Sequence, residues 1–152
     1  MAELKDRLRA DLTASMKDRD EIRTRTLRMV LTEIAKEEVS GASSRELDDA
    51  EIERVLAREA KRRREAAEAF SGAGRADQAS AELAEGRILA EYLPAQLDDA
   101  ELAALVAAAI AETGASGQAA MGQVMKAVTA KVAGRAEGAR VAAEVRRQLA
   151  AG

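Results

Sequence analysis

The chain has 152 residues and a formal net charge of −3, and it contains no His, Cys or Trp. The missing residue types exclude a Ser-His-Asp triad, a cysteine nucleophile, a disulfide and the usual zinc ligand sets. Phe70 and Tyr92 are the only aromatic residues, whereas 37 residues are Ala. Small and flexible aliphatic side chains suit packed helices better than a sheet, so we predict an all-α protein.

The N-terminal part of the chain predicts about four helices. Leu4, Leu8, Leu12 and Met16 recur every four residues, which gives the first helix one apolar stripe. Further apolar positions predict a second helix that ends near residue 39. A third helix begins at a cap on Asp48 or Asp49 and stops at Gly72 and Gly74. A fourth helix begins near Ala76.

The single proline, Pro94, marks a boundary between two domains. Proline lacks an amide donor and disfavours helix at the residue before it. We predict an N-terminal helical domain over residues 1–95 and a small three-helix domain over residues 96–152. Asp98 with Glu101 resembles a capping box at the start of the fifth helix, and Gly114 closes that helix. Two further helices follow, and Gly134 and Gly138 bracket the turn between them.

Charge is unevenly distributed in the C-terminal part. Residues 98–115 carry a net charge of −4, whereas residues 116–152 carry +4. A basic surface of this kind could engage phosphate groups, with strongly salt-dependent affinity. The alternative interpretation is a solvated helix face. The basic residues are Lys126, Lys131, Arg135, Arg140, Arg146 and Arg147.

A second basic cluster, residues 58–64, has a more ordinary interpretation. The spacings Glu59–Arg63, Lys61–Glu65 and Arg64–Glu68 each place opposite charges one helical turn apart. We therefore expect these charges to neutralise one another on a helix surface. No base or oxyanion hole accompanies the serines of the loop at 43–44, so we expect no catalytic role for them. We predict no catalytic residues, no metal and no cofactor. No apolar run reaches the roughly 18 residues of a membrane span, and there is no signal peptide, so we expect a cytoplasmic protein.

Five short stretches, taken together, resemble one family over essentially the whole chain. In this order and spacing they are similar to the YqeY family of small bacterial proteins, which is itself similar to the C-terminal portion of the B subunit of the tRNA-dependent amidotransferase. The one departure is Glu137, where the family pattern has Asp. The stretches are TLRMVL at 26–31, AGRAD at 73–77, EYLPAQL at 91–97, MGQVM at 121–125 and GRAEG at 134–138.

The resemblance implies a function in tRNA recognition, because the corresponding tail of the amidotransferase is associated with tRNA. It also implies the family label of a carbon–nitrogen ligase with glutamine as amido donor, although glutamine hydrolysis and tRNA activation belong to parts that this chain lacks. We therefore predict a non-catalytic module whose partners are tRNA, amidotransferase subunits or an aminoacyl-tRNA synthetase. The alternatives are a helical protein–protein adaptor and an authentic enzyme. The predicted nucleic-acid-binding residues are Lys126, Lys131, Gly134, Arg135, Gly138 and Arg140.

Overall fold

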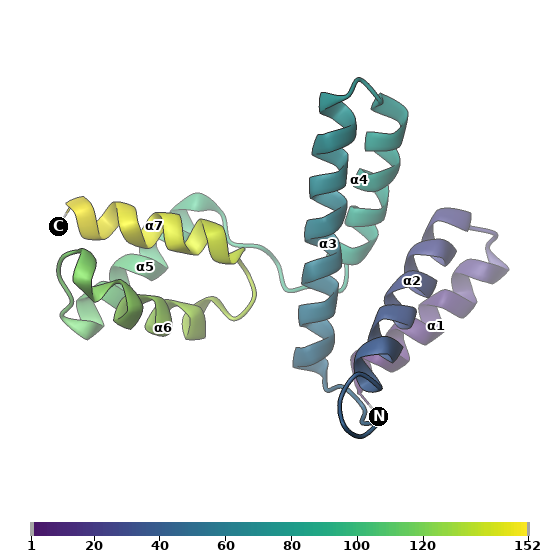
Figure 1. Cartoon of the computed structure of the whole chain (residues 1–152), viewed down its shortest axis with the longest axis horizontal. Coiled ribbons are helices and arrows are strands. Elements are labelled where there is room, and N and C mark those ends of the chain that lie inside the picture. The colour runs from purple at the N-terminus through teal and green to yellow at the C-terminus, as the bar shows by residue number, and fades with distance from the viewer. Residues whose placement is uncertain (1, 152) are drawn as a thin grey trace. The chain divides into compact units, whose positions relative to one another are not determined.

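All regular structure in the computed structural model, which describes residues 2–151, is helical (Figure 1). The prediction of an all-α fold is therefore confirmed. The described chain divides at the Leu93–Pro94 bond into two compact units. Unit 1 ends at residue 93 and unit 2 begins at residue 94, two residues before the boundary that the sequence suggests.

Unit 1 consists of two helical hairpins that pack against each other. The first hairpin is α1 (Glu3–Lys17) with α2 (Glu21–Glu38), and the second is α3 (Asp49–Gly72) with α4 (Ala76–Ala90) (Figure 1). Aliphatic side chains from all four helices fill the core, as the spacing of apolar residues predicts. The fully buried ones include Leu8, Leu27, Val30, Ile34, Ile52, Leu56 and Leu89.

Local signals explain where these helices begin and end. Asp48 accepts a hydrogen bond from the Glu51 amide at 2.8 Å, and the Glu51 carboxylate accepts one from the Asp48 amide at 2.9 Å. This reciprocal capping box satisfies amides that the first turn of α3 would otherwise leave without partners. Beyond α3, Gly74 adopts a φ of +74°, a left-handed conformation that glycine tolerates and that turns the chain toward α4.

The loop between α2 and α3 is held by one carboxylate. Lys5 is buried and donates to both oxygens of Glu38 at 2.8 Å. The same carboxylate accepts a hydrogen bond from the Leu47 amide at 3.1 Å, and the Leu47 side chain enters the core. The ion pair therefore connects α1, the end of α2 and the loop.

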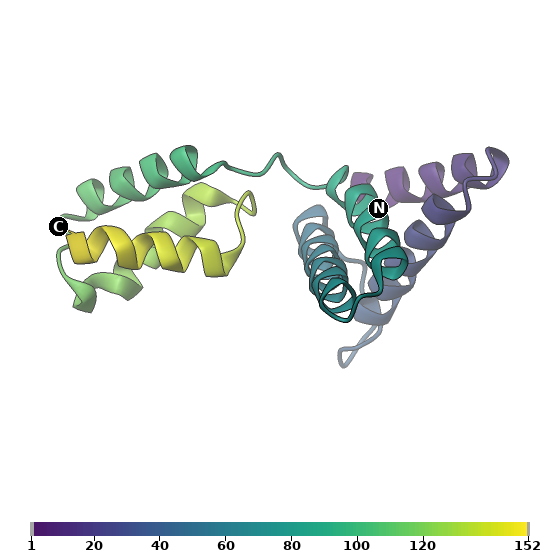
Figure 2. The same ribbon diagram turned by 90° about the horizontal axis from the view of Figure 1, so that it is seen from above.

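Unit 2 is a bundle of three α-helices. Its elements are α5 (Asp99–Thr113), the short 3₁₀ helix η1 (Gln118–Ala120), α6 (Met121–Val132) and α7 (Gly138–Ala151) (Figure 2). Each α-helix contacts the other two, and η1 contacts α6 and α7. Valine dominates the core, and the buried residues are Leu97, Leu102, Val106, Ala109, Val124, Val128, Val132, Val141, Val145 and Leu149.

Two details of unit 2 differ from the sequence prediction. Asp98 caps α5 by accepting from the Glu101 amide at 2.7 Å, but the return bond of a capping box is not formed. Helix α6 ends at Val132, and the residue that caps it, Ala133, has a φ of +49°, so the left-handed conformation begins one residue before Gly134. An alanine in this conformation is uncommon because its Cβ crowds the backbone.

Candidate nucleic-acid interface

The six predicted nucleic-acid-binding residues lie on α6, on the α6–α7 turn and in the first turn of α7. Lys126 is exposed on α6 and forms no ion pair with any residue in the described range 2–151. Its ammonium group is thus available to an anionic ligand. The remaining predicted residues have structural contacts or conformational roles of their own.

Arg135 stabilises the end of α6. Its Nε donates to the carbonyl of Val132 at 3.1 Å, and its Nη2 donates to the carbonyl of Lys131 at 3.0 Å. The last carbonyls of a helix lack intrahelical partners and carry partial negative charge, so a guanidinium group is well suited to cap them. The Arg135 carbonyl also accepts from the Leu97 amide at 2.8 Å, which fixes the segment before α5 to this turn.

Lys131 and Arg140 form ion pairs with α5. The Lys131 ammonium lies 3.0 Å from the Glu112 carboxylate, and Arg140 lies 3.0 Å from Asp99. The side chain of Glu112 is 60% exposed and that of Asp99 is fully exposed. Exposed pairs of this type contribute about 0–1 kcal/mol and exchange readily with other ions. Both cations therefore remain accessible to a competing anion.

The two predicted glycines have different conformations. Gly134 follows Ala133 in the left-handed region with a φ of +80°, so two consecutive residues turn the chain sharply. Gly138 begins α7, and a Cβ built on it would meet no atom within 4 Å. Space around the backbone at Gly138 is thus open, and a ligand could approach the first turn of α7.

Two further cations of unit 2 lie on α7 but were not among the predicted site residues. Arg146 is exposed, and its side chain has no ion-pair partner in the part of the chain that the structure describes. Arg147 binds Glu144 through its guanidinium group, which lowers the pKa of that carboxyl to about 2. Both arginines contribute to the charge surplus after residue 115, whereas the GRAEG stretch points to the turn as the site. Arg146 is therefore an exposed cation of unit 2 that the predicted set does not include.

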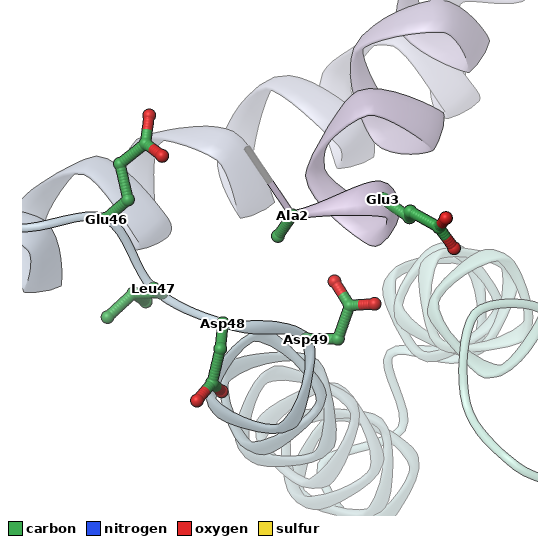
Figure 3. Close-up of a pocket in the computed structure, with 6 residues that line it drawn as sticks. All are labelled: Ala2, Glu3, Glu46, Leu47, Asp48 and Asp49. Carbon is green, nitrogen blue, oxygen red and sulfur yellow. The ribbon is translucent and has the colours of Figure 1, made fainter.

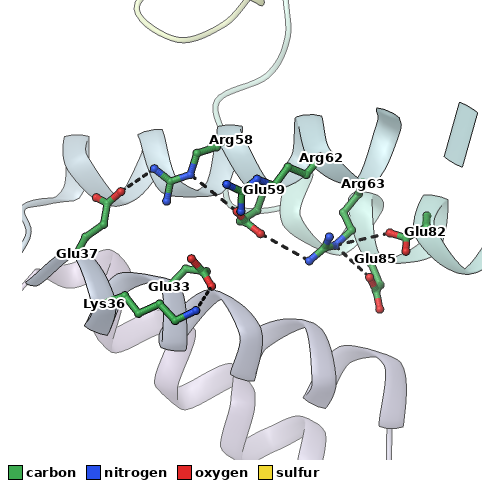
Figure 4. Close-up of polar contacts among 9 residues, drawn as sticks. All are labelled: Glu33, Lys36, Glu37, Arg58, Glu59, Arg62, Arg63, Glu82 and Glu85. Atoms are coloured by element: carbon green, nitrogen blue, oxygen red, sulfur yellow. Dashed lines mark hydrogen bonds and ion pairs between the residues drawn. The ribbon is translucent and has the colours of Figure 1, made fainter. Parts of the chain in front are cut away.

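Cations of the basic cluster on α3 form ion pairs with carboxylates, as the spacing predicts (Figure 4). Glu59 is buried and contacts Arg62 at 2.8 Å and Arg63 at 3.6 Å, and Lys61 lies 3.9 Å from Glu65. The Glu59–Arg63 and Lys61–Glu65 pairs are thus confirmed. Arg63 also reaches α4, where its Nε lies 3.1 Å from Glu85. This cluster links neighbouring helices rather than presenting a basic surface.

Unit 1 also has a pocket where the first turns of α1 and α3 meet (Figure 3). Two of its carboxylates act as helix caps: Asp49 accepts from the Leu4 amide at 3.1 Å, and Asp48 caps α3. Within residues 2–151, no group of three acidic side chains is arranged to hold a metal ion. The pocket is lined by Ala2, Glu3, Glu46, Leu47, Asp48 and Asp49.

Comparison with known proteins identifies the family. A family model described as Yqey-like protein matches residues 5–149. The chain belongs to the YqeY family. The YqeY match extends over nearly all of both units, so both are parts of one family architecture. None of the curated proteins matches this sequence. No helix in the described part of this YqeY protein has the length and apolar character needed to cross a membrane.

Proposed function

We propose that this YqeY protein is a non-catalytic module that binds tRNA through the α6–α7 surface, defined here by the basic residues of α6, α7 and their turn. The observation that carries the proposal is the segregation of charge within unit 2. Unit 2 has six basic and six acidic residues; all six basic ones fall in residues 126–147, whereas Asp98, Asp99, Glu101 and Glu112 belong to α5 and its cap. The other two acidic residues, Glu137 and Glu144, lie among the six basic ones, so α6, α7 and their turn carry a surplus of four positive charges in a unit with no net charge.

The internal ion pairs are compatible with phosphate binding. A phosphate can replace Glu112 at Lys131 and Asp99 at Arg140, because both carboxylates are more than half exposed and their pairs are weak. A phosphate can bind Lys126 and Arg146 without displacing a carboxylate, since neither residue forms an ion pair in the described chain. Neutralising several phosphates at once would release counterions and make the affinity fall steeply with salt.

We further propose that the module acts together with a partner enzyme. The resemblance of the motifs to the amidotransferase B-subunit tail favours a role beside glutamine-dependent tRNA amidation or beside an aminoacyl-tRNA synthetase, in the cytoplasm. In this role the module would hold the tRNA while a partner performs the carbon–nitrogen ligase chemistry. Arg135 would support the surface by capping α6 rather than by contacting phosphate.

The experiment that tests the proposal is fluorescence anisotropy of labelled tRNA at two salt concentrations, with an unstructured RNA of equal length for comparison. The test variant is Lys126→Glu with Arg146→Glu, because these exposed residues form no ion pair in residues 2–151. The charge-matched control is Arg54→Glu with Arg87→Glu, two exposed arginines of unit 1. We expect the test variant to weaken tRNA binding about tenfold or more and the control to bind like the wild type. Equal binding by both variants would contradict the assignment.

A second candidate function, a protein adaptor, is favoured by one observation. The exposed side of α5 between Leu102 and Ala111 has no charged residue and presents Ala104, Ala107 and Ala108 to solvent. Such a face could pack against an apolar helix of a partner. Capture of the same partner before and after RNase treatment, with affinity insensitive to moderate salt, would favour the adaptor over tRNA binding.

A further inference from the structure

The tip of the α1–α2 hairpin, defined as residues 16–22 with Arg28, exposes two large apolar side chains. Met16 is 51% exposed and Ile22 is 43% exposed, on either side of the same short turn. In residues 2–151 four large apolar side chains are exposed, so this one turn carries half of them. Exposed apolar groups that gather at one place often mark an interaction site.

The tip also carries charges of both signs that have no ion-pair partner among the described residues. The neighbouring Arg23 and Arg25 bind Glu91, the residue after α4, and Glu85 of α4, at 2.7 Å and 3.0 Å, and so belong to the body of unit 1. The five charged residues of the tip without such a partner are Lys17, Asp18, Arg19, Glu21 and Arg28.

Hydrogen bonds fix the conformation of the tip. The hydroxyls of Ser15 and Thr24 lie 2.8 Å apart, and the Asp20 amide donates to the Ser15 carbonyl at 3.0 Å. Arg19 is held with a φ of +56°, a conformation that is uncommon for a long side chain. Arg28 Nη2 lies 3.7 Å from Met16 Sδ, so a charge and an apolar group lie side by side. The surface is therefore organised before any partner arrives.

We propose that the α1–α2 tip is a self-association surface that binds the same tip of a second copy of this chain. In a two-fold contact the same surface of both copies meets, so the unpaired cations of one tip can lie against the unpaired anions of the other. The side chains of Met16 and Ile22 would be buried at the centre of the contact, while the unpaired charges form ion pairs across it. The tip has three basic residues, Lys17, Arg19 and Arg28, and three acidic ones, Asp18, Asp20 and Glu21. It therefore has no net charge to attract the phosphates of a nucleic acid, which favours a second copy over RNA.

The expected dimer is weak, because one helical turn and its flanking residues offer less surface than a standard interface of roughly 1,600 Å². It should also be sensitive to salt, since its ion pairs lie at an exposed rim. The proposal is independent of tRNA binding, which is assigned to unit 2.

Sedimentation equilibrium from about 10 µM to about 1 mM tests the proposal with three charge variants. The acidic-tip variant is Lys17→Glu with Arg28→Glu, and the basic-tip variant is Asp18→Lys with Glu21→Lys. The control, Arg87→Glu with Asp77→Lys, changes two exposed residues of α4. We expect the wild type and the control to associate with rising concentration, and each tip variant alone to stay monomeric. An equimolar mixture of the two tip variants should associate again, whatever the register of the contact.

A fourth variant, Met16→Ser, keeps every charge and changes an exposed side chain, so it should fold normally and dimerise at least about fivefold more weakly. A wild type that remains monomeric over the whole concentration range would overturn the proposal. It would equally be overturned if the tip variants associated as strongly as the wild type, because the contact would then lie elsewhere.

Discussion

Glu59 is the most enclosed carboxylate of unit 1, with 2% of its surface exposed. A charge removed from water in this way is costly unless other charges compensate it. Arg62, Arg63 and Arg58 supply this compensation at distances of 2.8, 3.6 and 3.8 Å (Figure 4). The cluster therefore fixes how α3 packs. Removing Glu59 takes away the carboxylate that these three guanidinium groups share, although Arg58 keeps Glu37 and Arg63 keeps Glu85.

We predict that Glu59→Ala lowers the free energy of unfolding of unit 1 by about 2 kcal/mol or more, because like charges on α3 then repel one another. The matched control is Glu65→Ala, which removes an exposed partner 3.9 Å from Lys61 and should change stability by less than about 0.5 kcal/mol. Urea unfolding followed by the fluorescence of Tyr92, the only tyrosine, reports on unit 1. Equal stability of the two variants would contradict the role of Glu59.

The Lys5–Glu38 pair should make unit 1 sensitive to acid. Hydrogen bonds from the Lys5 ammonium lower the pKa of Glu38 below its ordinary value of 4.5. A lowered pKa means that the charged form is stabilised by folding, so the contribution is complete above about pH 4.5 and is lost as the pH falls through the lowered pKa.

We predict that Glu38→Gln lowers the thermal midpoint at pH 7 and that the difference in midpoint from the wild type narrows as the pH falls below about 4.5. Glu68→Gln, at an exposed position of α3, serves as the control and should follow the wild-type curve. A difference that stays constant over this pH range would show that the ion pair does not contribute through its charge.

At the scale of elements, the end of α6 combines two unusual features. Ala133 adopts a left-handed conformation, and Arg135 folds back to donate to the carbonyls of Lys131 and Val132. Because α6 and α7 both adjoin this turn, its geometry determines where the cations of the α6–α7 surface are held. Arg135 thus acts on the proposed interface through the helix it caps.

We predict that Arg135→Met destabilises unit 2 by about 1–2 kcal/mol, because two helix-terminal carbonyls lose a charged donor. Arg146→Met, at an exposed position, should change the stability by less than about 0.5 kcal/mol and yet weaken tRNA binding more. Amide hydrogen exchange in α6 measures the first effect and anisotropy the second. If Arg135→Met impaired RNA binding with no loss of exchange protection, Arg135 would be a phosphate contact instead.

The helices could be predicted from the sequence because their signals are local. Asp48 and Gly74 act within a few residues of the helix ends that they determine. The contacts that decide the electrostatics of the site are not local: Lys131 pairs with Glu112 and Arg140 with Asp99, 19 and 41 residues away. A net charge summed along the chain cannot reveal such pairs, which depend on how α5 packs against the other two helices. The cap formed by Arg135 was missed because glycines beside an arginine equally suggest an open phosphate site.

At the scale of the whole molecule, the chain consists of two units in which charged residues have different roles. Unit 1 joins its helices with ion pairs that include the buried Glu59 and the buried Lys5. Unit 2 has a core of mainly valine and leucine, and its six cations all lie on α6, α7 and their turn, whereas four of its six carboxylates belong to α5 and its cap. The two proposed interactions thus fall on different units: self-association on unit 1 and tRNA binding on unit 2.

The measurement that tests this assignment most directly is an NMR titration of the ¹⁵N-labelled full chain with tRNA at low salt. The account predicts that amide signals near Lys126, Gly138 and Arg146 shift or broaden, and that these changes reverse when salt is raised. Signals near Asp99 and Glu112 should also change, because phosphate displaces these carboxylates from Arg140 and Lys131. Signals from the middle of α5, residues 102–110, and from α3 should change little. Shifts concentrated in the middle of α5 or in unit 1, or no shifts at low salt, would contradict the claim that the α6–α7 surface binds tRNA.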